Sequence, residues 1–231
     1  MNDQNCSLFD IMGPVMVGPS SSHTAGVLKL ARMARFIMSD PIKKAEIVFY
    51  GSLAYTQKGH GSDKAVIAGL LGMDMDDEDI GQSFEIAALQ QLEFRFVSNF
   101  ELPEHFHPNT MTLILETAHK KMEIRGASIG GGNIEVQNID DYEVSLSGDY
   151  ETLLVWHHDV IGVIARVSES LARHSINIAA ITSHRKEKGE EALLVIQVDS
   201  EVGSHIQDEI KSFHSVYRVL YIPNIFAGVL T

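Results

Sequence analysis

The sequence predicts an α+β protein, with a domain of mixed helices and antiparallel strands over residues 1–148 and a second domain over residues 149–231. In roughly the first ninety residues, apolar side chains recur at the spacing of a helix, whereas later they alternate with polar ones, as in a strand. From residue 151 the patterns follow the order strand, helix, strand, strand, helix, strand. Helices that are segregated from a run of strands are typical of the α+β class.

The expected helices of the first domain lie before its run of strands. Ser22 or Thr24 is expected to cap the first helix, which ends before Pro41 because proline cannot continue a helix. The apolar residues of this helix have helical spacing: Val27, Leu30, Ala34 and Met38. Two further helices are expected over residues 62–71 and 80–90.

Short segments rich in strand-forming residues provide the expected sheet of the first domain. They cover residues 46–50, 93–96, 111–117, 122–124, 134–136 and 144–146. Because most of these segments follow one another without an intervening helix, we expect them to form an antiparallel sheet. The stretch Ser147-Gly148-Asp149 is expected to be a linker, so the first domain ends near residue 148.

The second domain is expected to have the ferredoxin-like βαββαβ arrangement. Its expected strands cover residues 153–156, 176–183, 192–198 and 216–222. The first expected helix has an apolar face made of Ile161, Ile164, Val167 and Leu171. Gly189 lies in the turn between the second and third strands, and the second helix covers residues 201–213.

Charge and hydropathy exclude several classes of protein. The net charge of −13 argues against a nucleic-acid partner, which would need clustered lysine and arginine. No apolar stretch approaches the roughly 20 residues that span a bilayer, and the first residues lack the pattern of a signal peptide. We therefore expect a cytoplasmic protein with no membrane partner. The acidic run at residues 74–79 is expected to be a solvated helix start, with divalent-cation binding as the alternative.

Cysteine and histidine usage argues against a metal site on this chain. Cys6 is the one cysteine, so it cannot form a disulfide within the chain or hold an iron–sulfur cluster, which usually takes four thiolates. It is expected to be an inert thiol. The pair His105 and His107 has metal-ligand spacing, but no third potential ligand lies at a sequence spacing that is typical of a metal site. We expect the chain to bind no metal by itself.

Two polar segments bounded by glycine are the candidate sites of chemistry. Residues 18–26 read Gly-Pro-Ser-Ser-Ser-His-Thr-Ala-Gly, and residues 58–63 read Lys-Gly-His-Gly-Ser-Asp. Each places a histidine, His23 or His60, in a turn beside an expected helix start, where backbone N–H groups can face a ligand. Histidine suits the acceptance of a proton near pH 7. The alternative for each is a loop or core histidine without a catalytic role.

Side chains next to the two histidines are candidate ligand contacts. Ser20, Ser21 and Ser22 offer hydroxyls beside N–H donors at a helix start, an arrangement that suits a carboxylate. The alternative is that Ser22 only caps the helix. Lys58 and Asp63 can add charge and orientation around His60.

Two later segments are weaker candidates. Asn109 follows His107-Pro108 directly before the expected strand at 111–117, and it is either a ligand-facing residue or part of a turn. Residues 130–132, Gly-Gly-Gly, either bind an anion through backbone amides or form a bend between two strands. Their spacing differs from the dinucleotide pattern Gly-x-Gly-x-x-Gly, so nicotinamide binding is not expected.

Taken together, these motifs resemble the β chain of the iron–sulfur L-serine dehydratases. The resemblance is carried by the two polar segments, by His-Pro-Asn-Thr at 107–110 and by Ser-Ile-Gly-Gly-Gly at 128–132, and it spans nearly the whole chain. It implies that the first domain is similar to the allosteric substrate-binding domain of some D-3-phosphoglycerate dehydrogenases. It also implies that the second domain is an ACT domain.

The resemblance implies a lyase that deaminates L-serine to pyruvate and ammonia. In that family the β chain pairs with an α chain that carries a [4Fe–4S] cluster, so this chain is expected to be inactive alone. His60 and His23 are then the candidate catalytic residues. The implied contacts for L-serine are Ser20, Ser21, Ser22, Lys58, Asp63 and Asn109. The alternatives are a regulatory protein that binds serine or a small anion without catalysis, and a bare dimerisation module.

The resemblance to ACT domains implies a second ligand site. The matching residues are Asp159, Gly162 and Asn177, and Ile161 stands where proline is common in the family. The alternative is dimerisation without a ligand, in which the edge strands of two copies join. Either way, the resemblance implies a homo-oligomer that forms through this domain.

Overall fold

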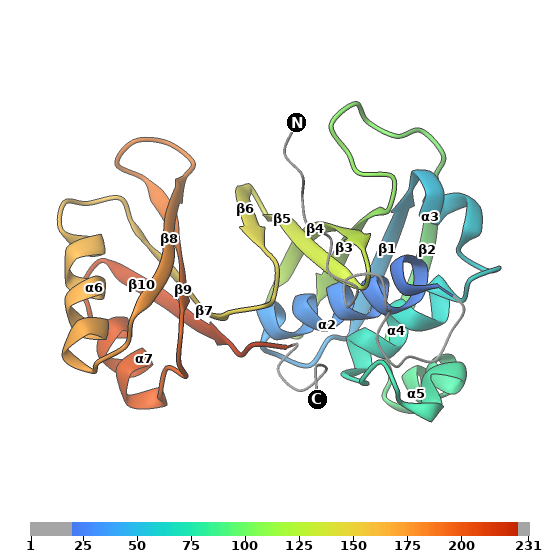
Figure 1. Ribbon diagram of the computed structural model, residues 1–231, viewed down its shortest axis with the longest axis horizontal. Coiled ribbons are helices and arrows are strands. Elements are labelled where there is room, and N and C mark those ends of the chain that lie inside the picture. Colours follow the sequence, from blue (N-terminus) through green and yellow to red (C-terminus); the bar gives the residue numbers. More distant parts are fainter. Residues whose placement is uncertain (1–19, 226–231) are drawn as a thin grey trace. The chain divides into compact units, whose positions relative to one another are not determined.

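The computed structural model describes residues 20–225, which form two compact units that divide between residues 137 and 138 (Figure 1). We predicted a domain boundary near residue 148, after strand β6 (Tyr142–Leu146). The second unit begins earlier because β6 contacts strand β8 (Ile178–Arg185) and because Lys186 forms an ion pair with Asp141 (2.8 Å). The α+β class predicted from the sequence is confirmed.

A six-stranded sheet begins in the first unit and has the order β2-β1-β3-β4-β5-β6. Its other strands are β1 (Lys44–Tyr50), β2 (Glu93–Asn99), β3 (Thr110–Glu116), β4 (Lys121–Gly130) and β5 (Asn133–Ile139). β3 pairs antiparallel with β1 and β4, but β1 and β2 are parallel. The prediction of an antiparallel sheet is wrong at this edge because helices connect β1 to β2 and return the chain to the end at which β1 began.

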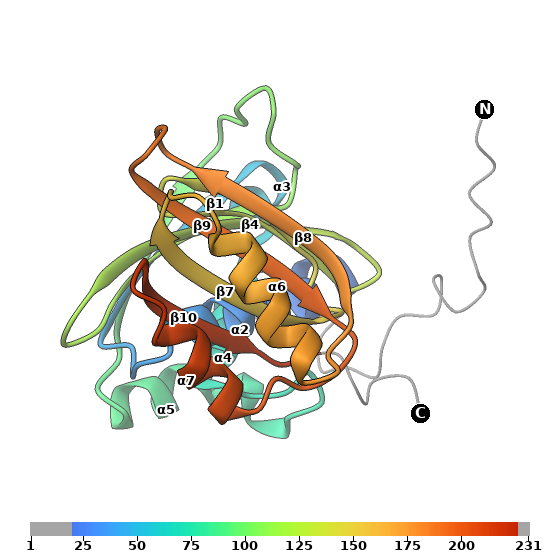
Figure 2. The same cartoon turned by 90° about the vertical axis from the view of Figure 1, so that its left-hand side faces the viewer.

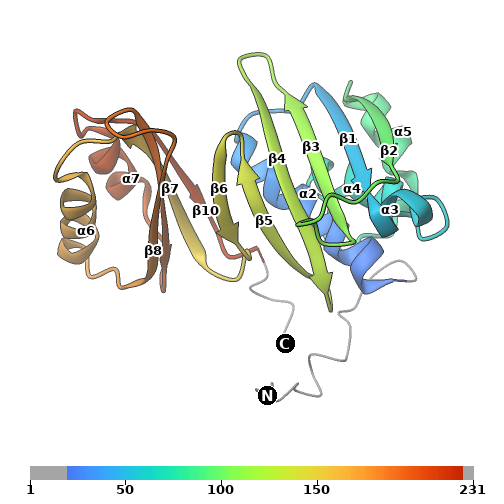
Figure 3. The ribbon, with the colours of Figure 1, turned by 90° about the horizontal axis from the view of Figure 1, so that it is seen from above.

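Four α-helices accompany this sheet: α2 (Gly26–Met38), α3 (Gly51–Thr56), α4 (Ser62–Leu71) and α5 (Ser83–Leu89). α2 and α4 pack against each other, and α2 also contacts β4 (Figure 3). Their approach is close at Gly69, where an added Cβ would overlap the carbonyl oxygen of Leu28 and lie 2.8 Å from the Ala31 side chain. Glycine therefore sets how near the two helices can come.

The apolar side predicted for α2 is confirmed, but the start of the helix differs from the prediction. Ser20, rather than Ser22 or Thr24, is the capping residue, because its hydroxyl accepts the N–H of His23 (3.2 Å). A π-helical turn, Ser21–Ala25, follows this cap and leads into α2. The hydroxyl of Ser22 instead lies beside the ring of His23, and that of Thr24 donates to the carbonyl oxygen of His60.

The region after β1 also differs from the prediction. The sequence does not predict α3, and the helix expected over residues 80–90 is divided into a 3₁₀ turn, Glu78–Gln82, and α5. Asp77 caps the 3₁₀ turn by accepting the N–H of Asp79 (2.9 Å). Asp74 forms an ion pair with Arg32. These contacts favour the interpretation of the acidic run as a solvated helix start.

The second unit contains a four-stranded antiparallel sheet with the order β10-β7-β9-β8. Its remaining strands are β7 (Glu151–His158), β9 (Glu191–Val198) and β10 (Val216–Ile222). Helices α6 (Val163–Arg173) and α7 (Ser204–Lys211) contact each other and lie on one face of this sheet (Figure 2). This is the predicted ferredoxin-like arrangement.

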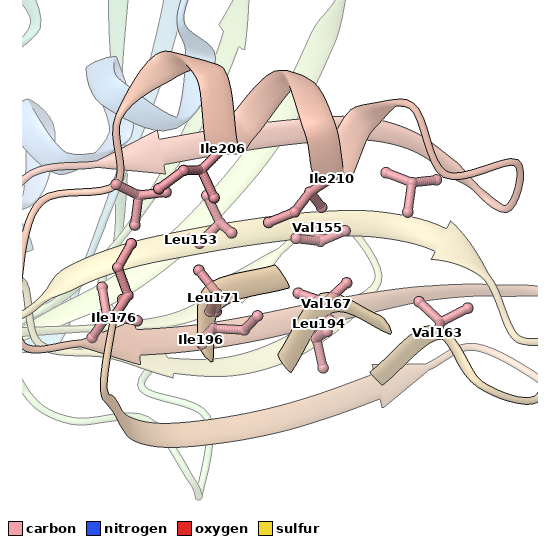
Figure 4. Packing of buried hydrophobic residues seen from close by; sticks show 13 residues of the cluster. Leu153, Val155, Val163, Val167, Leu171, Ile176, Leu194, Ile196, Ile206 and Ile210 are labelled. Carbon is pink, nitrogen blue, oxygen red and sulfur yellow. The ribbon is translucent and has the colours of Figure 1, made fainter. Parts of the chain in front are cut away.

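The core of the second unit lies between these helices and the sheet (Figure 4). Its main side chains are Leu153, Val155, Val167, Leu171, Leu194, Ile196, Ile206 and Ile210. The predicted face of α6 is half correct, because Val167 and Leu171 are buried whereas Ile164 and Ile161 are exposed. Ile161 precedes the helix, which begins at Val163, and so cannot share its buried face. Within residues 20–225, every helix is too short or too polar to cross a bilayer.

Candidate active site

The two glycine-bounded polar segments meet where α2 and α4 begin. His23 lies in the π-helical turn before α2, and His60 lies in the turn before α4. Their rings are arranged edge to face, with centroids 4.9 Å apart and an interplanar angle of 70°. The structure therefore brings together the two histidines that the sequence singles out as candidate catalytic residues.

Reciprocal hydrogen bonds join the two segments. The hydroxyl of Thr24, next to His23, donates to the carbonyl oxygen of His60 (3.0 Å). The hydroxyl of Ser62, near His60, donates to the carbonyl oxygen of His23 (2.6 Å). Both hydroxyl-bearing residues are buried. Because each segment holds the backbone of the other, the fold fixes the relative position of the two segments that carry the imidazoles.

Serine hydroxyls surround the ring of His23. The hydroxyls of Ser20 and Ser22 each lie 3.1 Å from its Nδ1 atom. The hydroxyl of Ser52, in α3, lies 3.0 Å from its Nε2 atom. Both ring nitrogens therefore have a hydroxyl partner that can donate or accept a hydrogen bond.

Burial lowers the pKa of His23 below its ordinary value of 6.5, and the charge of a protonated His60 lowers this pKa further. His23 is therefore neutral at pH 7 and able to accept a proton. Because the folded chain disfavours the charged form, this group's contribution to stability is complete above pH 6.5. It is lost as the pH falls from 6.5 through the lower pKa of the folded chain.

His60 is held through its backbone, while part of its ring is unpaired. Its N–H donates to the carbonyl oxygen of Thr56 (3.0 Å). Its Nδ1 atom is buried and makes no hydrogen bond with any described residue. A buried polar atom without a partner is costly in a folded chain, so this atom is a candidate contact for a ligand or an ordered water.

The segment around Asn109 joins this site to the sheet. The N–H of Ser52 donates to the carbonyl oxygen of Pro108 (2.9 Å), and the N–H of Ser128 donates to that of Asn109 (3.1 Å). Gly51 has a φ of +49°, and a Cβ there would lie 2.9 Å from the Pro108 carbonyl oxygen. Four motifs distant in the sequence therefore converge around the histidine pair.

The Ser128 segment approaches the start of α2 closely. A Cβ at Gly26 would overlap the hydroxyl of Ser128, whose side chain is fully buried. Gly130, Gly131 and Gly132 all have positive φ and form the turn between β4 and β5. This geometry favours the interpretation of the three glycines as a bend between strands.

Some predicted site residues do not join the histidine pair. Lys58 is exposed, and its side chain makes no hydrogen bond or ion pair with another described residue, while its carbonyl oxygen accepts the N–H of Gly61 (3.4 Å). Asp63 accepts the N–H of the next residue, Lys64 (2.9 Å), instead of contacting either histidine. Ser21 contributes its carbonyl oxygen, which accepts the N–H of Gly26, and its hydroxyl makes no hydrogen bond with a described residue.

The weaker metal candidates remain separate from this site. The Nδ1 atom of His107 accepts the N–H of Asn109 (3.1 Å), and His105 is exposed. Among residues 20–225, no three histidine, cysteine, aspartate or glutamate side chains are grouped so that they could hold a metal ion. Cys6 lies outside the described residues.

The sequence does not single out Ser52 and Ser128 as parts of this site. Thr24 and Ser62 lie within the two candidate segments, but the sequence does not indicate that their hydroxyls join these segments. Ser52 follows a glycine directly after a strand, which is the signal that could have identified it. A small residue in that place allows two backbones to approach each other.

The candidate ligand residues of the second unit lie apart within one chain. Asp159 follows β7, where it accepts the N–H of Gly189 (3.0 Å) and pairs with Arg185 (3.4 Å). The Gly189 hydrogen bond is the main reason that the pKa of Asp159 is lowered. Asn177 precedes β8 and donates to Asp199 (2.6 Å).

The two residues therefore mark opposite ends of the second sheet. The β7 end that precedes Asp159 pairs with the first residues of β9, whereas the start of β8 pairs with the last residues of β9. Gly162 has a φ of +93° at the start of α6, close to Asp159 in the sequence. Asp159 and Asn177 therefore do not form one pocket within a single chain.

Comparison with known families assigns each of the two units, the α+β unit with its paired histidines and the ferredoxin-like unit, to a class of domain. Residues 7–139 match the model of the serine dehydratase beta chain, and residues 152–214 match that of the ACT domain. The chain belongs to the serine dehydratase beta chain family, which confirms the resemblance found in the sequence.

Individual relatives agree with this assignment. The chain is 41% identical to the probable L-serine dehydratase, beta chain, of Bacillus subtilis, over 94% of this chain and 97% of that one. It is 35% identical to the L-serine dehydratase, beta chain, of Peptoniphilus asaccharolyticus, with the same coverage. It is also 26% identical to a D-3-phosphoglycerate dehydrogenase of Methanocaldococcus jannaschii, over 84% of this chain and 36% of that protein.

Proposed function

We propose that this chain is the β subunit of an L-serine dehydratase and that its histidine pair completes an active site together with a cluster-bearing α chain. The relatives named L-serine dehydratase, beta chain, support the substrate and the need for a partner. The observation that carries the proposal is the fixed pair of His23 and His60 with the buried, unpaired Nδ1 atom of His60.

The proposed reaction needs a base for the α-proton of L-serine. His60 is the proposed base, because His23 already has hydroxyl partners at both ring nitrogens whereas His60 has an atom left for a ligand. Loss of the α-proton and of the hydroxyl group gives aminoacrylate. Hydrolysis of aminoacrylate then gives pyruvate and ammonia.

The start of the π-helical turn is the proposed site for the carboxylate of L-serine. The first N–H groups of a helical turn have no acceptor inside it, and they favour an anion. Ser21 and Ser22 are the first two residues of this turn, and Ser20 caps it. Asn109 is proposed as a further contact, supported by its two hydrogen bonds to Ser128, which approaches the start of α2. Lys58 and Asp63 are proposed only as outer contacts that a bound partner would approach.

The residues of this chain do not fit an iron–sulfur cluster. Its sequence has one cysteine, whereas such a cluster usually takes four thiolates. We therefore assign the cluster, and the electrophile that activates the hydroxyl of serine, to the α chain. The work of this chain is to bind the amino acid, to orient it and to accept its proton.

Reconstitution tests this proposal. The purified chain alone is expected to form no pyruvate from L-serine, and the cluster-bearing partner alone is expected to form little. A mixture of the two is expected to turn over, with a rate that saturates as this chain is added. Full turnover by the partner without this chain would contradict the proposal. Micromolar binding of L-serine to the isolated chain, seen by calorimetry, with no gain in turnover would instead favour a regulatory protein.

We also propose that the second unit joins two copies of the chain. β8 is an edge strand, and most of its residues are exposed. An edge strand presents unpaired N–H and C=O groups that another strand can bind. Apolar side chains are exposed on β8 and around the start of α6: Ile181, Val160, Ile161 and Ile164. A second copy, paired through β8, would cover both features.

A further inference from the structure

Ser52 links three parts of the site. Its hydroxyl lies 3.0 Å from the Nε2 atom of His23, and its N–H donates to the carbonyl oxygen of Pro108 (2.9 Å). It sits in the first turn of α3, one residue after Gly51. The side chain is half-buried.

The hydroxyl of Ser52 makes no hydrogen bond with the backbone of α3, the helix that contains it. A serine caps a helix when it occupies the N-cap position, which in α3 belongs to Tyr50. No side-chain cap is present at the start of α3, and the Ser52 hydroxyl is directed to His23 instead. The backbone of Ser52 is meanwhile held by Pro108, so the hydroxyl is presented from a fixed position.

A hydroxyl is well suited to an imidazole whose protonation state changes. A neutral ring has one donor and one acceptor nitrogen, and a protonated ring has two donors. Ser52 can donate to Nε2 in one state and accept from it in another, since a serine hydroxyl does both. With Ser20 and Ser22 at Nδ1, the ring of His23 is held at both nitrogens throughout.

We propose that Ser52 is a positioning residue, which holds the ring of His23 against His60 and so keeps His60 aligned for proton transfer. The inference rests on the proposed function for its effect on turnover. Because the ring centroids of His23 and His60 are 4.9 Å apart, a change in the orientation of the His23 ring would alter the position of the His60 ring. Ser52 also makes the histidine pair depend on the His-Pro-Asn segment, because Pro108 fixes its backbone.

The test compares Ser52→Ala with Ser52→Thr in the enzyme assembled with its partner. Loss of an outer-shell partner that orients a metal-bound imidazole typically lowers activity by about 10- to 100-fold, and we expect the same range for a residue that orients His23. We expect Ser52→Ala to lower kcat by about that factor and to change KM by less than about threefold, since the binding of serine does not use this hydroxyl. Ser52→Thr keeps the hydroxyl and is expected to restore most of kcat. Unchanged kcat in Ser52→Ala would overturn the proposal.

A second readout does not depend on turnover. The ¹⁵N chemical shifts of the His23 ring in the isolated full-length chain, assigned by comparison with His23→Asn, report which nitrogen carries the proton. Ser52→Ala is expected to change them and Ser52→Thr to keep them, and unchanged shifts in Ser52→Ala would overturn the inference. If the wild-type mixture forms no pyruvate, the proposed function fails, whereas the ring shifts still decide the role of Ser52.

A matched control is available in the same helix, at Tyr55. Its side chain is exposed, and its hydroxyl makes no hydrogen bond with a described residue. Tyr55→Phe removes a hydroxyl from α3 and is expected to leave kcat and the His23 ring shifts unchanged. Effects as large as those of Ser52→Ala would show that any loss in α3 disturbs the site, and would overturn the specific role of Ser52.

Discussion

Replacement of His60 by alanine is expected to lower kcat/KM for L-serine by about 10²- to 10⁴-fold, the usual contribution of a positioned acid or base. The physical reason is the loss of the imidazole that faces His23 and carries the buried, unpaired Nδ1 atom. The fold should persist, because the backbone of His60 is held by Thr56 and Thr24 through bonds that alanine keeps. The measurement is steady-state pyruvate formation by the assembled enzyme.

The control for this variant is His119→Ala. His119 is exposed in the turn between β3 and β4, in the same unit. It is expected to leave kcat/KM unchanged. Co-elution with the partner and the thermal unfolding temperature show whether His60→Ala still folds and assembles. Wild-type turnover by an assembled His60→Ala enzyme would show that His60 is not the base.

Replacement of Gly69 by alanine is expected to destabilise the chain by about 1–3 kcal/mol, the usual cost of overpacking. An added Cβ would overlap the carbonyl oxygen of Leu28, which is backbone and cannot turn aside. Relief requires α2 and α4 to separate, and these helices begin at the two histidine segments. Turnover should therefore fall together with stability. Urea unfolding, followed by circular dichroism, measures the free energy.

Gly81→Ala is the matched control for Gly69→Ala. No atom lies within 4 Å of a Cβ built at Gly81, and its φ is not positive. Its free energy of unfolding is expected to change by less than about 0.5 kcal/mol, as for most surface substitutions. Equal stability of the two variants would contradict the close packing of α2 on α4.

Local patterns identified most elements of the fold. The alternation around Met122 and Ile124 marked β4, and the apolar spacing from Val27 to Met38 marked α2, because each pattern reports one buried face. The parallel pairing of β1 with β2 could not be predicted in this way. It depends on the path of the intervening helices, and a strand segment carries no signal for the direction of its neighbour.

The site was predicted in part. His23 and His60 could be selected because glycines flank polar turns at helix starts, and the structure brings both together. Ser52 lies in a helix of six residues whose position depends on Pro108, so its partner at His23 is a tertiary contact without a local signal. Lys58 shows that closeness in the sequence does not ensure a contact in the fold. It lies two residues before His60, but its side chain is exposed.

The second unit shows the same limit. Its strand and helix order could be predicted, whereas the exposure of Ile161 and Ile164 could not, because the sequence does not fix where α6 begins. Asp159 and Asn177 match a ligand pattern, but each already has a partner within the chain. Periodicity identifies buried faces, and it does not say which polar pairs form.

A structure of the assembled α and β chains with L-serine bound tests the central claim most directly. The account predicts that the amino acid lies between the partner's cluster and this chain, with its α-carbon beside the ring of His60 and its carboxylate at the turn that begins at Ser21. A structure in which both histidine segments face bulk solvent, remote from the cluster and from the bound serine, would contradict it.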